Sequence, residues 1–425
     1  MIKKTNRKKV IHCNLSDIYM SVAFNKGIVV VLHAPKSCSH IVYNALLESR
    51  RRIRLRYKKK LPPNYDNLFI TGITDREAIF GGEKLLQNSL AEIIKAKNPE
   101  CLVVLSGCAA GVIGDDIQAI CAKTEANFKI PVIHIPGAGF MSNQQQEGLL
   151  LTTKYFLEKF MTSSAIKNSK SAVIFGINKF YLMTEDIEEI RRMYHYFGID
   201  DIMLPPCGMT IKEMQELSSA SVVGVNSIID SKLNEYKYFA AGFAQKLQIP
   251  FIEKRLPLTI TETLAYLQEL GAKLNQKELA DQAILCETKR WQSKITELRS
   301  YLNGKSCVLA ISHSIKFWNL LEFIALLQEA GIQLKHVILL NELTAKEKSE
   351  YVDFISKNNL QLKIDHENYP LPIDAEKDII ITSDYRETFK HQYCIKRKRI
   401  GIGGSIRFLE KLYLLFKENR SLIHE

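Results

Sequence analysis

The chain has 425 residues, which at roughly 150 residues per domain predicts about three domains. Hydrophobic residues make up 46% of it and charged residues 24%, a globular balance that excludes a long disordered chain. No apolar run approaches the roughly 18 residues that a membrane span needs, and no apolar core of a secretory signal follows the basic N-terminus. We therefore expect a cytoplasmic protein that does not enter a membrane.

The formal net charge is +12, and the excess of positive charge is concentrated in two clusters, Arg50–Lys60 and Lys396–Arg399. Clustered cations bind nucleic acid by releasing the counterions of its phosphates. However, only Tyr57 is interleaved as an aromatic residue in the first cluster, and no helix-turn-helix, zinc-finger or RNA-recognition pattern occurs. We therefore favour a solvated face, or a docking face for an acidic protein, and expect no nucleic-acid partner.

The nine cysteines are not expected to form a disulfide framework. Their number is odd, no CxxC motif occurs, and a cytoplasmic chain is kept reduced. We interpret four of them as small buried hydrophobic residues within or beside apolar elements: Cys101, Cys121, Cys286 and Cys307.

Short apolar strands alternate with helices along the chain, which is typical of parallel α/β sheets. In the first third, buried strands are predicted at Ile28–Leu32, Leu102–Leu105 and Val132–Ile135, and a helix is predicted at Lys84–Lys95. A polar stretch rich in serine and lysine, Thr162–Ser171, then indicates a linker.

Two further series of strands and helices follow the linker. In the second, strands are predicted at Ala172–Phe175, Ser221–Val225 and Phe251–Ile252, one helix from Asp186 to before Gly198, and another at Thr259–Leu270 with Gly271 as its C-cap. A long polar helix at Gln276–Tyr301 leads to the third, with strands at Val308–Ile311, Val337–Leu340 and Ile379–Ile381 and a final helix at Ser405–Phe416.

We therefore predict an α/β fold of three doubly wound domains with mostly parallel sheets, at residues 1–165, 166–290 and 291–425. Such sheets bind ligands at the carboxyl ends of their strands. Three facing domains would leave an interdomain cleft, which could hold a substrate or cofactor.

Two of the remaining cysteines directly follow predicted strands. Cys38 lies in the segment HAPKSCSH, before an apolar helix at Ile41–Leu47, and Cys108 lies in the segment LSGCAAGVIGDDI. Free N–H groups and the helix dipole at such positions lower the pKa of a thiol and favour the thiolate, the form that binds metal. Cys13 precedes a short predicted helix at Ser16–Phe24. Taken singly, each could equally be a packed loop cysteine.

The segment TDREAIFGGEKL at residues 74–85 lies between the second and third of these cysteines, and PGAGF follows at residues 136–140. Together, the three ordered cysteines, FGGEKL, the GC…IGDDI turn and the PGAGF loop resemble the nitrogenase component 1 superfamily. This superfamily includes the molybdenum–iron protein subunits, the cofactor-assembly scaffold and the reductases that act on protochlorophyllide and nickel-sirohydrochlorin. The terminal GG…FLEKLY helix extends the resemblance over nearly the whole chain, more loosely after Ala165.

The resemblance implies an iron–sulfur cluster bound by Cys13, Cys38 and Cys108, either a [4Fe–4S] cluster or a larger one shared between two chains. A [4Fe–4S] cluster takes four protein ligands, so three cysteines leave one position open and we expect the cluster at a subunit interface. The partner would be a sister component 1 subunit or a second copy of this chain. Because the chain has no GxxxxGK[ST] motif, the resemblance implies a separate ATP-dependent iron–sulfur reductase of the nitrogenase iron-protein type.

These implications favour a nitrogenase-like oxidoreductase subunit, which passes electrons from its cluster to a substrate or cofactor in the cleft. Two alternatives stay open: a scaffold or maturation protein for metal-cluster assembly, and a non-redox chelate-binding protein. We expect no iron–molybdenum cofactor, because the resemblance implies a cysteine anchor in the middle domain and none occurs between Cys207 and Cys286. Near the family's second anchor, His391 and Cys394 are interpreted as packing residues. No catalytic residue and no substrate can be named.

Several neighbours of the cysteine motifs are interpreted as structural. Asp115 and Asp116 are expected in the first turn of a helix, where they oppose its dipole, and tuning of a cluster is the alternative. Gly81 and Gly82 are expected to allow a close backbone approach or an unusual dihedral angle. The histidines that flank these loops are interpreted as satisfied loop or core residues: His33, His40 and His134.

Overall fold

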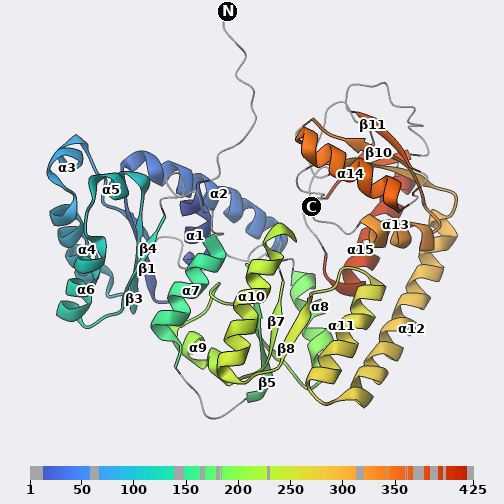
Figure 1. The fold of residues 1–425 in the computed structure, drawn as a ribbon, viewed down its shortest axis with the longest axis horizontal. Coiled ribbons are helices and arrows are strands. Elements are labelled where there is room, and N and C mark those ends of the chain that lie inside the picture. Colours follow the sequence, from blue (N-terminus) through green and yellow to red (C-terminus); the bar gives the residue numbers. More distant parts are fainter. Residues whose placement is uncertain are drawn as a thin grey trace, which may run out of the picture.

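The computed structural model contains three parallel β-sheets with helices packed around them, and Figure 1 shows the middle sheet between the other two. It describes residues 13–57, 67–137, 148–162, 168–178, 182, 184–226, 230–312, 320–341, 343–358, 360, 362–366, 378–382, 391–395 and 399–418. Every pairing between the described strands is parallel, which confirms the predicted α/β fold with mostly parallel sheets.

The first sheet has the strand order β2-β1-β3-β4 and is covered by helices on both faces. Its strands are β1 (Ile28–His33), β2 (Leu68–Ile70), β3 (Cys101–Ser106) and β4 (Val132–Pro136). Its helices are α1 (Asn14–Val22), α2 (Lys36–Tyr57), α3 (Asp75–Phe80), α4 (Glu83–Lys97), α5 (Cys108–Ile113), α6 (Ile117–Phe128) and α7 (Gly148–Phe160). Alternate residues of β1 face opposite layers, because Val30 and Leu32 pack with α1 and α7 while Val29 and Val31 pack with α4 and α6.

The second sheet has the order β6-β5-β7-β8 and shares a continuous hydrophobic core with the first. Its strands are β5 (Asn168–Phe175), β6 (Asp201–Met203), β7 (Ala220–Val225) and β8 (Phe251–Arg255). The helices around it are α8 (Thr184–His195), α9 (Ile211–Gln215), the 3₁₀ helix η2 (Glu216–Ser219), α10 (Asp230–Leu247) and α11 (Ile260–Lys273). Phe175 of β5 and Val223 of β7 belong to the same buried cluster as Leu15 of α1, so the first two sheets are packed together.

The third sheet has the order β11-β10-β9-β12-β13 and its own hydrophobic core. Its strands are β9 (Ser306–Ile311), β10 (Gln333–Leu339), β11 (Lys363–His366), β12 (Asp378–Thr382) and β13 (Gln392–Cys394). Helices α13 (Leu320–Glu329), α14 (Ala345–Lys357) and α15 (Gly401–Glu418) pack with it, and the long helix α12 (Lys277–Leu302) leads to it from the second unit. Trp291 and Ile295 of α12 are buried in this core, so α12 is part of the third unit's packing.

The exact domain limits stay a prediction. The limit at 165/166 falls outside the described residues, and the limit at 290/291 falls within the continuous helix α12. The predicted interdomain cleft also stays a prediction. Among the described residues, no helix is both long and apolar enough to cross a membrane.

The structure corrects two local predictions. Gly271 does not end α11, which continues to Lys273; a Cβ at Gly271 would lie 2.4 Å from the Cβ of Ala280, so the glycine lets α11 and α12 pack closely. Cys286 was expected to be buried, but it is exposed on α12, since this long helix turns only one side to the core. Both errors come from packing between helices, which local sequence does not specify.

An ionic network joins the second and third units. The buried carboxylate of Glu287 on α12 pairs with Arg192 of α8 and lies 3.5 Å from Arg290. Glu189 of α8 accepts hydrogen bonds from both arginines and from the backbone N–H of Gly403 at the start of α15. Burial raises the pKa of Glu189, but Arg192 and the other donors outweigh it and hold this pKa below its usual value. The network therefore fixes α8, α12 and α15 relative to one another.

Replacing Glu287 by alanine is expected to destabilise the chain, because Arg192 and Arg290 lose a buried carboxylate partner and keep only Glu189. We expect a loss of about 1.5–3 kcal/mol in the free energy of unfolding and a thermal midpoint lower by several degrees. The control is Lys294→Ala, which removes an exposed pair with Glu297 on the same helix and should leave the midpoint unchanged. Equal midpoints for the two variants would contradict the role given to this network.

Candidate functional site

The three predicted ligands lie at the starts of three helices in the first unit. Cys13 occupies the N-cap position of α1, Cys38 lies in the first turn of α2, and Cys108 is the first residue of α5. Helix α2 begins at Lys36, earlier than the predicted Ile41, so Cys38 belongs to the helix and not to the loop before it.

The parallel pairing of β1 with β3 brings two of these starts together. His33, the last residue of β1, lies opposite Ser106, the last residue of β3. The next helices begin two or three residues later, with Cys38 in α2 and Cys108 in α5. Cys13 joins them from α1, whose buried residue Leu15 packs in the same core as Leu32 of β1.

The three thiols are close enough for the charge on one to affect the pKa of another. Burial raises the pKa of the Cys13 thiol; the N–H groups of Leu15 and Ser16 oppose this, and a charge on Cys108 adds to it. Burial also raises the pKa of the Cys38 thiol, and charges on Cys13 and Cys108 raise it further. The structure therefore places the three predicted ligands at one site.

The direction of these shifts corrects one expectation. The start of α2 was expected to lower the pKa of the Cys38 thiol, but burial and the charges on Cys13 and Cys108 raise it. The metal-free site therefore holds Cys13 and Cys38 mainly as neutral thiols. Metal binding must displace their protons, as it does for cysteine sites in general.

The chemistry of the three side chains fits an iron–sulfur cluster, because such clusters are usually held by cysteine thiolates. Among the residues that the structure describes, no group of three or more His, Cys, Asp or Glu side chains is placed to hold a single metal ion.

The site is open to the surface and has apolar neighbours. Cys38 and Cys108 are partly exposed, whereas Cys13 is buried. Ile41 and Val112, about one turn further along α2 and α5, are 46% and 69% exposed. More large exposed apolar side chains lie on α2 and on α3, which contacts α5: Tyr43, Ile79 and Phe80. Exposed apolar residues gathered in this way indicate an interaction surface.

A buried histidine and an aspartate connect the loops around the cysteines. The Nε2 atom of His33 lies 3.1 Å from Oδ2 of Asp115, and its Nδ1 atom lies 2.9 Å from the hydroxyl of Thr71. Asp115 was expected in the first turn of a helix, but it precedes that turn, and its Oδ1 accepts from the N–H of Gly82. Asp116 is the N-cap of α6, and its side chain accepts a hydrogen bond from the N–H of Ala119. It is therefore a structural residue at a helix start, as expected, but it lies one position before the first turn.

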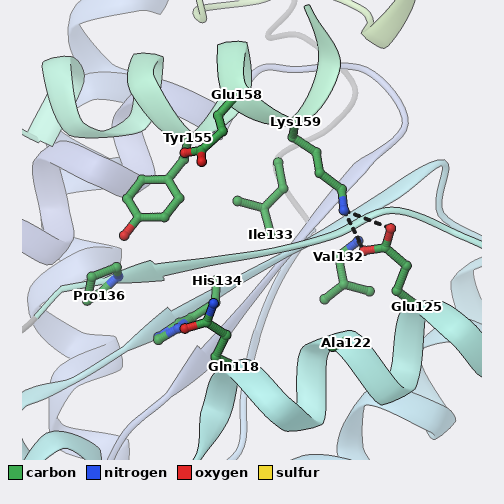
Figure 2. Close-up of a pocket in the computed structure, with 10 residues that line it drawn as sticks. All are labelled: Gln118, Ala122, Glu125, Val132, Ile133, His134, Pro136, Tyr155, Glu158 and Lys159. Atoms are coloured by element: carbon green, nitrogen blue, oxygen red, sulfur yellow. Dashed lines mark hydrogen bonds and ion pairs between the residues drawn. The ribbon is translucent and has the colours of Figure 1, made fainter.

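A separate cavity of about 450 Å³ lies at the outer edge of β4, between α6 and α7 (Figure 2). Lys159 and Glu125 form an ion pair in its wall, with Nζ to Oε distances of 2.6 and 2.7 Å. The same glutamate accepts a hydrogen bond from the N–H of Val132. None of the described residues that line this cavity is a cysteine, so it is distinct from the cysteine site.

Comparison with known proteins identifies the family and the fold. The profile of the family described as nitrogenase component 1 type oxidoreductase matches residues 21–413. The chain belongs to this family. A solved structure titled "Nitrogenase Cp1 at pH 6.5" covers 96% of the chain, and the chain covers 88% of it, with a TM-score of 0.62 and 16% identity. At this identity the structural match supports the shared fold alone.

Several relatives within the family carry a biosynthetic name. The nitrogenase iron-molybdenum cofactor biosynthesis protein NifE of Clostridium pasteurianum is 24% identical over 82% of this chain and 77% of its own length. The NifE of Methanococcus maripaludis is 27% identical over 60% of this chain, and the match spans only 52% of that relative. A nitrogenase molybdenum-iron protein alpha chain from Methanosarcina barkeri matches 41% of this chain at 26% identity and spans 31% of its own length.

In the metal-free chain, alkylation of Cys38 is expected to reach half its maximal rate at a pH above 9.0, the usual pKa of the thiol. Only the thiolate reacts, and burial favours the neutral thiol, so the rate should still be rising through and beyond the neutral range. Mass spectrometry of peptides after timed exposure to iodoacetamide over a pH series measures this. The exposed Cys286 serves as the internal check on the reagent. A plateau for Cys38 below pH 9.0 would show that the helix start outweighs burial after all.

Proposed function

We propose that this chain is a subunit of a scaffold on which a metal cluster is assembled, and that Cys13, Cys38 and Cys108 hold an iron–sulfur cluster there. The carrying observation is that three separate helix starts, those of α1, α2 and α5, each bring a cysteine to the same region of the first unit. The biosynthetic names of relatives support a scaffold over the electron-relay subunit that the sequence alone favoured.

The cluster is proposed to lie between this chain and a second subunit. Three thiolates leave a [4Fe–4S] cluster one ligand short, and two of the cysteines are partly exposed. The exposed Ile41 and Val112 beside them would be covered by the same partner. The partner must supply the missing ligand and cover these apolar side chains. A sister component 1 subunit or a second copy of this chain could do both.

A redox role is the second candidate, and the family's description as an oxidoreductase favours it. In that case an ATP-dependent iron–sulfur reductase would dock on the complex, and the cluster would pass its electrons to a substrate. The non-redox chelate-binding alternative is disfavoured by the three gathered thiols, which suit iron–sulfur ligation better than binding of a preformed chelate. We propose a cytoplasmic location, where free thiols stay reduced.

Replacing Cys13, Cys38 and Cys108 together by alanine is expected to abolish iron binding. The wild-type chain, produced and purified without oxygen together with its partner, should hold about four irons per cluster and show a broad visible absorption that air bleaches. Cys121→Ala, a buried cysteine on α6 of the same unit, and Cys286→Ala, an exposed one, are the matched controls and should keep the iron. Unchanged iron in the triple variant would refute the ligand assignment, and a colourless, iron-free wild-type complex would favour a non-redox binding protein.

The scaffold and redox roles differ in what leaves the protein. We expect the isotopically labelled cluster of the loaded complex to move to a metal-free acceptor of the nitrogenase type, without multiple turnover of any substrate. The measurement is the label in each protein after anaerobic separation, with the triple cysteine variant as the background. Repeated product formation with a reduced reductase and ATP, while the label stays on this chain, would assign the redox role instead.

A further inference from the structure

The loop network around the cysteines connects elements that are distant in the sequence. His33 ends β1, Thr71 follows β2, Gly82 precedes α4 and Asp115 follows α5. The side chains of His33 and Asp115 are 0% and 2% exposed, so their hydrogen bonds do not compete with water. We call these four residues the His33 network.

His33 is bonded to both ends of the short helix that begins with Cys108. At the N-terminal end, the backbone carbonyl of His33 accepts a hydrogen bond from the N–H of Gly107, at 3.0 Å. At the C-terminal end, the ring binds Asp115, just after the C-cap Gly114. A single residue at the end of the neighbouring strand therefore fixes the position of α5.

Burial lowers the pKa of His33 and favours its neutral ring. In that ring Nε2 carries the proton and donates it to Asp115, because a carboxylate only accepts, and Nδ1 accepts from the hydroxyl of Thr71. The other carboxylate oxygen of Asp115 accepts the N–H of Gly82 at 2.7 Å. A Cβ at Gly82 would lie 2.6 Å from Asp115 and 3.0 Å from His33, so glycine is needed for this close approach.

We propose that His33 and Asp115 are positioning residues of the cysteine site, which hold Cys108 at the correct distance from Cys38 for cluster binding. This inference deepens the proposed function, because it concerns the same site. Neither side chain ligates metal in this role. They act through the ends of α5 and through β1, which leads to Cys38 five residues after His33. Partners of this kind around a metal site typically change metal affinity by about 10–100-fold when they are removed.

The first test uses the metal-free chain. In His33→Ala and Asp115→Ala, amide hydrogen exchange across residues 107–114 is expected to be about tenfold faster or more, because the C-terminal end of α5 loses its side-chain bond to β1 while the backbone bond of Gly107 remains. His134→Ala is the matched control: His134 lies on β4 at the same end of the sheet and bonds the hydroxyl of Ser106, but it binds neither end of α5. Unchanged exchange of α5 in both network variants would overturn the proposal.

The second test uses the loaded complex and separates position from charge. Asp115→Asn can keep every hydrogen bond, because its oxygen accepts from Gly82 while its NH₂ group donates to a His33 ring protonated on Nδ1. We expect His33→Ala and Asp115→Ala to lose iron to a chelator at least about tenfold faster, with an altered electron paramagnetic resonance spectrum. Asp115→Asn and His134→Ala should stay within about threefold of wild type.

Each outcome decides between the alternatives. If Asp115→Asn loses iron as fast as Asp115→Ala, the carboxylate acts through its charge and the positioning role is wrong. Thr71→Val removes only the hydrogen bond to Nδ1 of His33, so its rate of iron loss should lie between those of wild type and His33→Ala. This milder variant tests the network even if His33→Ala does not fold. If the wild-type complex holds no iron at all, the proposed function fails, whereas the exchange measurement on α5 still decides this inference.

Discussion

The parallel register of β1 and β3 is the constraint on which the cysteine site depends. Because His33 lies opposite Ser106, the two strands end level with each other, and the helices that follow begin at the same edge of the sheet. A shift of the register would separate Cys38 from Cys108 by about 3.3 Å for each residue. The buried Val31 and Leu32 hold the register through the layers on both faces.

The strands of this site were predictable from the sequence, whereas the position of Cys13 and the supporting contacts were not. Apolar runs predicted the strands that became β1 and β3, so the strand-end settings of Cys38 and Cys108 followed directly. Cys13 joins them only through the packing of α1 in the shared core, which no local pattern encodes, and its assignment depended on family resemblance. His33 and Asp115 are 82 residues apart in the sequence, so their pairing could not be predicted from either motif alone.

Burial explains why the pKa of Cys38 differs from the expectation based on its helix start. A helix start predicts a lowered thiol pKa only where water also reaches the sulfur, and for Cys13 and Cys38 desolvation is the larger effect. How much accessible surface a residue loses depends on the packing of the whole chain, which a local sequence pattern does not specify.

The strands β2 and β6 were missed for another reason. Each has only three residues, which are too few to show alternation.

In the proposed complex, both the protons of the ligands and the second subunit affect how the cluster is held. Burial keeps Cys13 and Cys38 protonated in the metal-free state, so each proposed bond from these sulfurs to iron forms with release of a proton. Cys38 and Cys108 are partly exposed in this chain alone, and the proposed second subunit would cover them. Release of the cluster to an acceptor would therefore require this subunit to separate from the cysteine site, whereas an electron relay would keep the two subunits together.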